Sequence, residues 1–277
     1  MIKCITLLIL CLTLAGCQSV STPQDQHEYH VVTTQVSRAQ GSRIRFLVIH
    51  YTAEDFPTSL NTLTDEQVSS HYLIPANPPL EKGKPVVWQL VAESQAAWHA
   101  GASYWRGFTR LNLSSIGIEL ENAGYRLRLT GTRWTPFPPE QIALLTSVAR
   151  EIVARYQIAP QNVVAHSDIA PLRKQDPGPL FPWKTLAQAG IGVWPDEARV
   201  VFYLAGRPVN QPVDTGRLLD KLARYGYPLS PDMTARQKHQ VIAAFQMHFR
   251  PENHQGQPDA HSEAIVDALL EKYGATR

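Results

Sequence analysis

Two histidines and one aspartate stand where they could bind a metal ion. His50 ends the apolar run Phe46-Leu-Val-Ile-His50, and His166 ends the similar run Asn162-Val-Val-Ala-His166. Asp176 follows His166 after a loop bounded by prolines. Two histidines and a carboxylate that leave one coordination position open form a typical catalytic zinc site. These three side chains therefore predict a zinc centre if the fold brings them together.

Each of these residues also has a structural interpretation. A lone histidine at the end of a strand is more often structural than a metal ligand. The parallel context of His50 and His166 changes this balance, because adjacent strands that end together place both imidazoles at one edge of a sheet. Asp168 is a competing carboxylate, but it lies only two residues after His166. We expect Asp168 to stabilise the loop or to support a ligand rather than to bind the metal.

A carboxylate and an ammonium group accompany this predicted centre. Alternation along the strand 116–120 places Glu119 on the face opposite the isoleucines. A carboxylate in so apolar a strand is costly unless it is paired or faces a wet cleft. Glu119 is either half of a surface salt bridge or, near a metal-bound water, a general base. Lys174, two residues before Asp176, adds a cation beside the predicted metal.

The first sixteen residues have the features of a bacterial secretion signal. Lys3 gives a charged start, and the apolar stretch 4–14 that follows is too short to span a bilayer. The sequence Leu14-Ala-Gly-Cys17 resembles the lipobox of bacterial lipoproteins. This resemblance implies cleavage before Cys17, attachment of diacylglyceryl and an acyl chain such as palmitate, and anchoring in a membrane. Gln18 after the cysteine suggests the outer membrane, with the protein facing the periplasm; an ordinary secretory signal is the alternative.

Cysteine usage and net charge narrow the chemistry further. Of the three cysteines, Cys4 and Cys11 leave with the signal and Cys17 would carry lipid. The mature chain then offers no disulfide and no thiolate, so a zinc ion must be held by His, Asp or Glu. The formal net charge of +2 falls by one unit when Lys3 leaves. So small a charge gives no reason to propose a nucleic-acid partner.

The central part of the chain reads as an α/β domain. Residues 17–40 carry the lipidated cysteine and a polar tether, and the catalytic domain is expected over 41–195. The segment 138–153 begins with prolines and carries apolar residues at helical spacing. It therefore predicts a long helix that ends before Pro160. Segments 76–85 and 122–139 are predicted as surface loops. Short apolar runs predict strands at 44–51, 71–74, 86–91, 116–120 and 163–165.

A different pattern begins after the Gly- and Pro-rich stretch 190–195. Three amphipathic segments with capping residues predict a small bundle over 197–277, with helices that begin near Asp214, Thr234 and Ala260. No catalytic cluster is evident there, so we expect a binding module. Its four histidines are predicted to be surface or packing residues: His239, His248, His254 and His261.

The order of motifs resembles a known enzyme family. It is similar to the zinc-dependent N-acetylmuramoyl-L-alanine amidases of the type-2 family, in the superfamily that includes the peptidoglycan recognition proteins. Aspartate at the third ligand position resembles the AmpD-like branch. The resemblance covers about residues 40–190. It rests on His50, Ser70-His71-Tyr72, Ala97-Trp98-His99-Ala100-Gly101, Ile116-Gly-Ile-Glu119 and His166-Ser-Asp followed by Lys174-Gln-Asp176-Pro-Gly.

This resemblance implies a fold, a reaction and a set of roles. It implies a central mixed β-sheet flanked by helices, followed by a small three-helix peptidoglycan-binding domain that adds wall affinity without touching catalysis. The substrate would be peptidoglycan or muropeptides, cleaved between the lactyl group and L-alanine. The implied roles are Zn²⁺ ligands for His50, His166 and Asp176, general base for Glu119, carbonyl-side cation for Lys174, and substrate-groove positions for His71, Trp98, His99 and Ala100.

Two other functions fit parts of the pattern. Zinc peptidases of the cell wall also use two histidines and an aspartate, but they need a His-x-His pair that this chain lacks. Some recognition proteins of the same superfamily bind peptidoglycan without cleaving it, because they have lost a metal ligand. A non-catalytic peptidoglycan-binding lipoprotein is therefore the alternative to the amidase.

Overall fold

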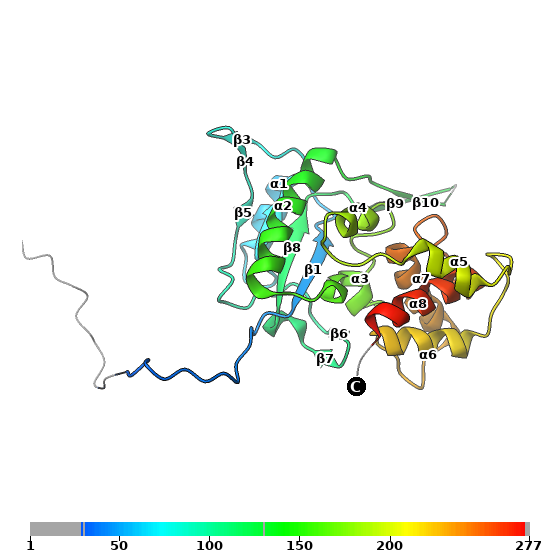
Figure 1. The fold of residues 1–277 in the computed structure, drawn as a ribbon. Coiled ribbons are helices and arrows are strands. Elements are labelled where there is room, and N and C mark those ends of the chain that lie inside the picture. Colours follow the sequence, from blue (N-terminus) through cyan, green and yellow to red (C-terminus); the bar gives the residue numbers. More distant parts are fainter. Residues whose placement is uncertain (1–28, 30, 130, 275–277) are drawn as a thin grey trace, which may run out of the picture. The chain divides into compact units, whose positions relative to one another are not determined.

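The computed structural model describes residues 29, 31–129 and 131–274 (Figure 1). The chain divides between Gly41 and Ser42 into two units. All the helices and strands described below belong to the second unit. The predicted signal and the lipidation site at Cys17 lie outside the described residues. Among the described residues, no helix has both the length and the apolar character needed to cross a membrane.

A five-stranded mixed sheet forms the centre of the Ser42–Arg277 unit, in the order β11-β1-β8-β2-β5 (Figure 1). The first four strands in this order are parallel, and the edge strand β5 is antiparallel to β2. Carboxyl ends of parallel strands meet at one edge of the sheet. The strands are β1 (Phe46–Tyr51), β2 (Tyr72–Ile74), β5 (Trp88–Gln89), β8 (Ser115–Leu120) and β11 (Val163–Ala165).

Both faces of this sheet are buried, and β1 shows this most clearly. Leu47 and Ile49 belong to an apolar cluster that includes helix α2 (Pro139–Tyr156). Phe46 and Val48 belong to a second cluster, which includes the C-terminal helices. Strands buried on both faces read as continuous apolar runs, which is why the run before His50 is unbroken. The predicted long helix is α2, and together these elements confirm the predicted mixed α/β fold.

Two predicted surface loops contain short hairpins. β9 (Tyr125–Arg128) pairs with β10 (Gly131–Trp134), and β3 (Leu80–Glu81) pairs with β4 (Lys84–Pro85). Their side chains are mostly exposed, so no alternation of apolar residues marks them in the sequence. A third hairpin joins β6 (Tyr104–Trp105) to β7 (Phe108–Thr109). Single-turn 3₁₀ segments occupy Leu111–Leu113 and Pro160–Asn162.

Three short helices follow strands of the sheet along the chain: the first comes after β1, and the other two come after β11. Helix α1 (Phe56–Leu63) begins at Asp55, whose carboxylate accepts a hydrogen bond from the Thr58 amide. Helix α3 (His166–Ile169) follows β11 without a loop. Helix α4 (Trp183–Gln188) begins directly after Pro182.

The C-terminal segment contains four helices where the sequence predicted three. The additional helix is α5, whose apolar residues 200–204 are contiguous and so carry no helical spacing. Side chains of Asp196, Asp214, Thr234 and Asp259 cap the four helices. The division of Ser42–Arg277 into two folding domains stays a prediction. The helices are α5 (Glu197–Leu204), α6 (Thr215–Tyr225), α7 (Ala235–Phe249) and α8 (Ala260–Tyr273).

Candidate metal centre and active site

The fold brings the three predicted metal ligands together. The Nδ1 atoms of His50 and His166 lie 2.9 Å apart, and Asp176 Oδ2 lies 3.1 Å from the first and 3.0 Å from the second. All three side chains are buried. In a tetrahedral zinc site with bonds of about 2.0–2.1 Å, neighbouring ligand atoms lie about 3.3 Å apart. The triangle of donor atoms therefore fits a zinc ion.

Hydrogen bonds around His50 orient its ring toward this triangle. Ser115 Oγ donates to the Leu111 carbonyl at 2.6 Å, so it accepts from His99 Nε2 at 3.1 Å. His99 Nδ1 is then an acceptor, and it receives the His50 Nε2–H at 3.0 Å. The proton of neutral His50 thus resides on Nε2, and its Nδ1 lone pair faces the other two ligands.

Strand β8 leaves room for the hydrogen-bonded chain His50–His99–Ser115, because its alternating side chains place Gly117 and Glu119 on the same face. In the parallel register Gly117 pairs with Val48, and Glu119 pairs with His50. A Cβ atom on Gly117 would lie 2.5 Å from the His99 ring. Only glycine leaves the space that His99 occupies beneath His50. Burial, followed by the neighbouring His166, lowers the pKa of His50 to about 4, which keeps the imidazole in the neutral form that binds metals.

His166 presents the same ring nitrogen by a different route. Its Nε2 donates to the Ala100 carbonyl at 3.3 Å, and a carbonyl can only accept. Arg173 donates to the same carbonyl at 2.8 Å. His166 opens helix α3 directly after β11, so its position depends on that short turn.

Asp176 lies in a loop that is closely packed from behind. The Asp176–Pro177 peptide bond is cis, and Gly178 has a φ of +80°. A Cβ atom on Gly178 would lie 2.5 Å from the Trp134 ring, so the hairpin β9–β10 covers the loop. Burial alone would raise the pKa of Asp176, but His166 and His50 hold it below its usual range. The carboxylate is therefore ionised and available as a ligand.

Glu119 lies beside the ligand triangle, with one carboxylate oxygen near His50 and the other free to accept a proton. Its Oε1 is 4.0 Å from His50 Nδ1. Among the described residues, its buried Oε2 has no hydrogen-bond partner. Burial, and then the charge of Asp176, raise the pKa of Glu119 well above its ordinary value. A free carboxylate with a high proton affinity next to a metal site can act as a general base.

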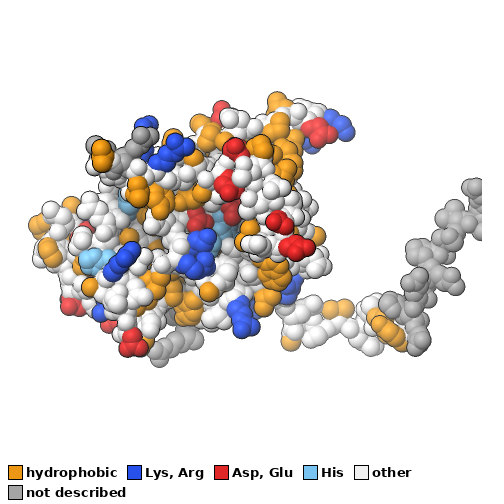
Figure 2. All heavy atoms as spheres, turned by 180° about the vertical axis from the view of Figure 1, so that it is seen from behind, with side chains coloured by type: hydrophobic (Ala, Val, Ile, Leu, Met, Phe, Trp, Pro, Cys, Tyr) orange, Lys and Arg blue, Asp and Glu red, His pale blue; other side chains and the backbone are white. Residues whose placement is uncertain are grey.

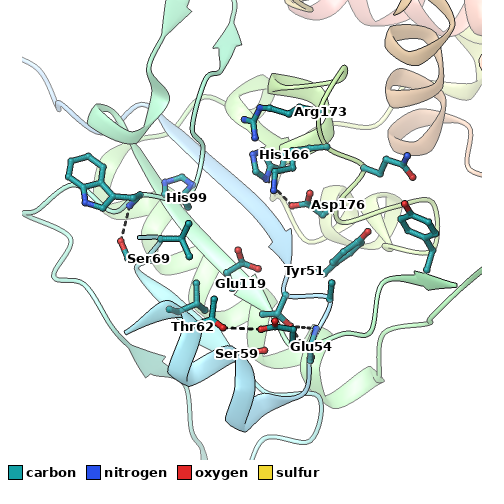
Figure 3. A pocket seen from close by; sticks show the side chains of 18 residues that line it. Tyr51, Glu54, Ser59, Thr62, Ser69, His99, Glu119, His166, Arg173 and Asp176 are labelled. Carbon is teal, nitrogen blue, oxygen red and sulfur yellow. Dashed lines mark hydrogen bonds and ion pairs between the residues drawn. The ribbon is translucent and has the colours of Figure 1, made fainter. Parts of the chain in front are cut away.

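Glu119, His166 and Asp176 line one cleft with a volume of about 350 Å³. Figure 3 shows the Glu119 carboxylate in the open space between His99, His166 and Asp176 on one side and Thr62 and Glu54 on the other. In the view of Figure 2, basic side chains lie beside histidine and acidic side chains in the middle of this unit. Helix α1, the segments 51–54 and 173–176, and Trp98, whose side chain is 52% exposed, complete the walls. Lys174 is part of this lining.

The four predicted substrate-groove residues occupy different places. Trp98 and His99 line the cleft, and His99 also supports His50. His71 and Ala100 are buried and are not among the lining residues. His71 Nδ1 accepts from the Gly117 amide at 3.0 Å, which ties it to the sheet. The Ala100 carbonyl holds His166.

Two residues near the site were not expected from the sequence. Tyr227 and His248 come from the C-terminal segment, and both donate to the buried Asp168 carboxylate. His248 is 3% exposed and lies between Met247 and Phe249 on a buried stretch of α7. A polar residue within an apolar stretch was the available signal, but the sequence does not show which carboxylate it meets.

The sequence profile of a known enzyme family agrees with this site. A family described as N-acetylmuramoyl-L-alanine amidase, Amidase_2, matches residues 40–179, which include the three candidate ligands, Glu119 and Lys174. The chain belongs to this type-2 amidase family. Membership confirms the resemblance drawn from the motifs and explains why they occur in one order.

Individual type-2 amidases are similar over nearly the whole chain. The N-acetylmuramoyl-L-alanine amidase AmiD of Escherichia coli is 59% identical over 263 residues, which is 95% of each chain. The solved complex of AmiD with anhydro-N-acetylmuramic acid-L-Ala-D-gamma-Glu-L-Lys has a TM-score of 0.88 and 60% identity, and covers 89% of this chain and 96% of that one. AmpDh3 of Pseudomonas aeruginosa, in complex with anhydromuramic pentapeptide, has a TM-score of 0.78 and 41% identity, with 91% and 98% covered.

Proposed function

We propose that the protein is a zinc-dependent N-acetylmuramoyl-L-alanine amidase that acts in peptidoglycan turnover. It would hydrolyse the amide bond between the lactyl group of N-acetylmuramic or anhydro-muramic acid and the L-alanine of the stem peptide. The observation that carries this proposal is the buried triangle of His50, His166 and Asp176, with Glu119 beside it, whose Oε2 has no hydrogen-bond partner among the described residues. The muropeptide in the complex of the similar AmiD supports the substrate class.

The residues of the cleft have different roles in amide hydrolysis. His50, His166 and Asp176 would hold the zinc, which supplies a Lewis acid and an activated water. Glu119 accepts the proton of the attacking water on its free carboxylate and passes it to the leaving L-alanine nitrogen. Lys174 stabilises the negative charge that develops on the lactyl carbonyl oxygen, an electrostatic contribution that is usually large in such sites.

A complete set of chemical groups distinguishes this proposal from a binding-only protein. Loss of a metal ligand would leave a groove that binds muropeptide without cleaving it. Here all three ligand positions are filled, and Glu119 and Lys174 line the same cleft. The walls include exposed Trp98, which we propose as a contact for the sugar or peptide.

We further propose that Cys17 anchors the protein by lipid to the outer membrane, with the enzyme facing the periplasm. The lipobox-like sequence before Cys17 and the polar tether to residue 40 support this proposal. Replacement by Cys17→Ala should move the protein from the outer-membrane fraction to the soluble periplasmic fraction. If the variant stays with the membrane, lipid on Cys17 is not the anchor.

A defined muropeptide gives the direct test of the activity. Zinc-loaded protein is incubated with an anhydro-muramyl peptide and with a muramyl peptide, and the products are identified by mass spectrometry. We expect free stem peptide with L-alanine at its amino end, together with the intact sugar. Cleavage within the peptide or between sugars, or no cleavage at all, would contradict the proposed function. The C-terminal helices are proposed to add affinity for peptidoglycan, which sedimentation with sacculi would measure.

A further inference from the structure

Asp168 is a fully buried carboxylate whose hydrogen-bond donors come from distant parts of the chain. Its Oδ2 accepts from the Ala165 amide at 2.7 Å and from His248 Nδ1 at 2.7 Å. Its Oδ1 accepts from the Tyr227 hydroxyl at 2.5 Å. The relative exposure of Asp168 is 0%. Two of its three donors therefore belong to the C-terminal helical segment, and the third belongs to the strand that leads to His166.

The turn that Asp168 stabilises carries two of the three metal ligands. Asp168 lies on α3, two positions after His166, and its bond to the Ala165 amide fixes the residue just before that ligand. On the other side of His166, the amide of Ser167 donates to the Asp176 carbonyl at 3.0 Å. A shift of this turn would therefore move His166 and Asp176 together.

The two distant donors are held rigidly by the core. The His248 ring stacks on the rings of Trp183 and Phe249, with 3.9 Å between ring centres in each case. The Tyr227 ring packs edge-on against Trp105 at 5.0 Å. Rings fixed in this way hold their N–H and O–H groups at one position. Without them, a buried carboxylate would keep only one backbone donor, and the turn would have to open to let water reach it.

We propose that Tyr227 and His248 are positioning residues of the metal site, through which the C-terminal helices hold the His166 turn in the geometry that binds metal. This differs from the expectation that the helical segment leaves catalysis untouched. The inference rests on the proposed function only in naming zinc as the metal. It adds to any affinity of these helices for peptidoglycan.

The test uses full-length protein with single substitutions of matched shape. Tyr227→Phe removes one hydroxyl. His248→Phe keeps a stacking ring without the donor, whereas His248→Asn keeps a donor near the Nδ1 position without the ring. Tyr225→Phe is the control, because it removes a hydroxyl from the same aromatic cluster that is not among the donors to Asp168.

Zinc affinity is measured by competition with a chromophoric chelator, and ligand geometry by the visible absorption of the Co²⁺ form. Loss of a group that orients a metal ligand typically weakens binding by about 10–100-fold. We expect about tenfold weaker binding for Tyr227→Phe and for His248→Phe, with a changed Co²⁺ spectrum. We expect recovery in His248→Asn, and kcat should fall more than KM rises.

Clear results would overturn the inference. If Tyr227→Phe and His248→Phe bind zinc like Tyr225→Phe and give the same Co²⁺ spectrum, the two residues are structural only. If His248→Phe keeps its zinc affinity while His248→Asn loses it, the effect of His248 comes from the packing of its ring and not from its hydrogen bond to Asp168. Thermal unfolding of each metal-free variant shows whether the fold is retained. Wild-type protein that binds zinc but cleaves no muropeptide would refute the proposed function and leave this test intact.

Discussion

The two histidine ligands of the candidate metal site are supported by different regions of the molecule. His50 is oriented from within the sheet region, by His99 and Ser115, and by the space left at Gly117. His166 depends on a short turn whose central carboxylate, Asp168, is bonded by the C-terminal helical segment.

This difference separates two kinds of support. Strand β1 is hydrogen-bonded on both sides and buried on both faces, so the His50 backbone is held by the sheet. The His166 turn lies at the end of edge strand β11 and has one neighbouring strand. It therefore needs contacts from outside the sheet. The C-terminal helices supply them, and this makes a segment without catalytic residues part of the site.

The largest expected effect is the loss of a ligand, because supporting contacts cannot replace a missing donor atom. Asp176→Ala should weaken zinc binding by more than the roughly 100-fold limit typical of supporting residues, and should abolish amide cleavage. Zinc binding is measured as metal content after dialysis, and amide cleavage as product formation from a muropeptide. The surface variant Glu197→Gln is the control. Full cleavage by metal-free Asp176→Ala would exclude Asp176 as a ligand.

Replacement of the base should separate chemistry from metal binding. Glu119→Gln keeps the shape of the side chain and removes the carboxylate, so we expect zinc content to be retained and kcat to fall by about 10²–10⁴-fold. Kinetics of L-alanyl peptide release, together with metal analysis, give the two values. A variant with unchanged kcat would show that another group takes the proton.

The sheet-side support should fail independently of the helical support. His99→Phe removes the acceptor of the His50 Nε2–H, and we expect about 10–100-fold weaker zinc binding. If the two supports are independent, the free-energy costs of His99→Phe and Tyr227→Phe add in the double variant to within about 0.5 kcal/mol. A larger coupling, measured by the same chelator competition, would show that the two regions act as one unit.

The smallest effect on the site is expected from an ion-pair cluster in the helical segment. Glu263 is 4% exposed and accepts hydrogen bonds from Arg207 and Arg217 at 2.8 Å each, and from Lys221 at 3.1 Å. Burial alone would raise its pKa, but hydrogen bonds from Arg207 and Lys221 hold it at about 2. Glu263→Gln should destabilise the fold without changing zinc affinity.

The pH dependence of this cluster follows from the direction of the shift. Because the folded pKa of Glu263 lies below its ordinary value of 4.5, its contribution is complete above that pH and is lost as the pH falls toward 2. The contribution is on the order of 2 kcal/mol, allowing for solvent around the cations. Urea unfolding of wild type and Glu263→Gln should differ at pH 7 and converge only near pH 2 or below. If Glu263→Gln weakens zinc binding as much as Tyr227→Phe does, the metal site depends on the general stability of the helices and not on the specific hydrogen bond to Asp168.

Much of the fold could be predicted because its signals are local. The unbroken run before His50 marks a strand buried on both faces, and the spacing in 139–156 marks one face of a helix. Helix α5 and the hairpin β9–β10 could not be predicted, because one has contiguous apolar residues and the other has no buried face. Local periodicity reports burial only where one face of an element is buried.

By itself, the sequence determined the chemistry available: two imidazoles at the ends of apolar runs, an aspartate after a proline-bounded loop, a glutamate in a strand, and no free cysteine in the predicted mature chain. Side-chain identity and strand alternation are local properties, so these expectations needed no coordinates. Tertiary structure alone decided which ring nitrogens face the metal and which residues hold them there. The two side-chain donors to Asp168, Tyr227 and His248, lie 59 and 80 positions after it. Only folding brings groups so far apart in the chain into hydrogen-bond contact.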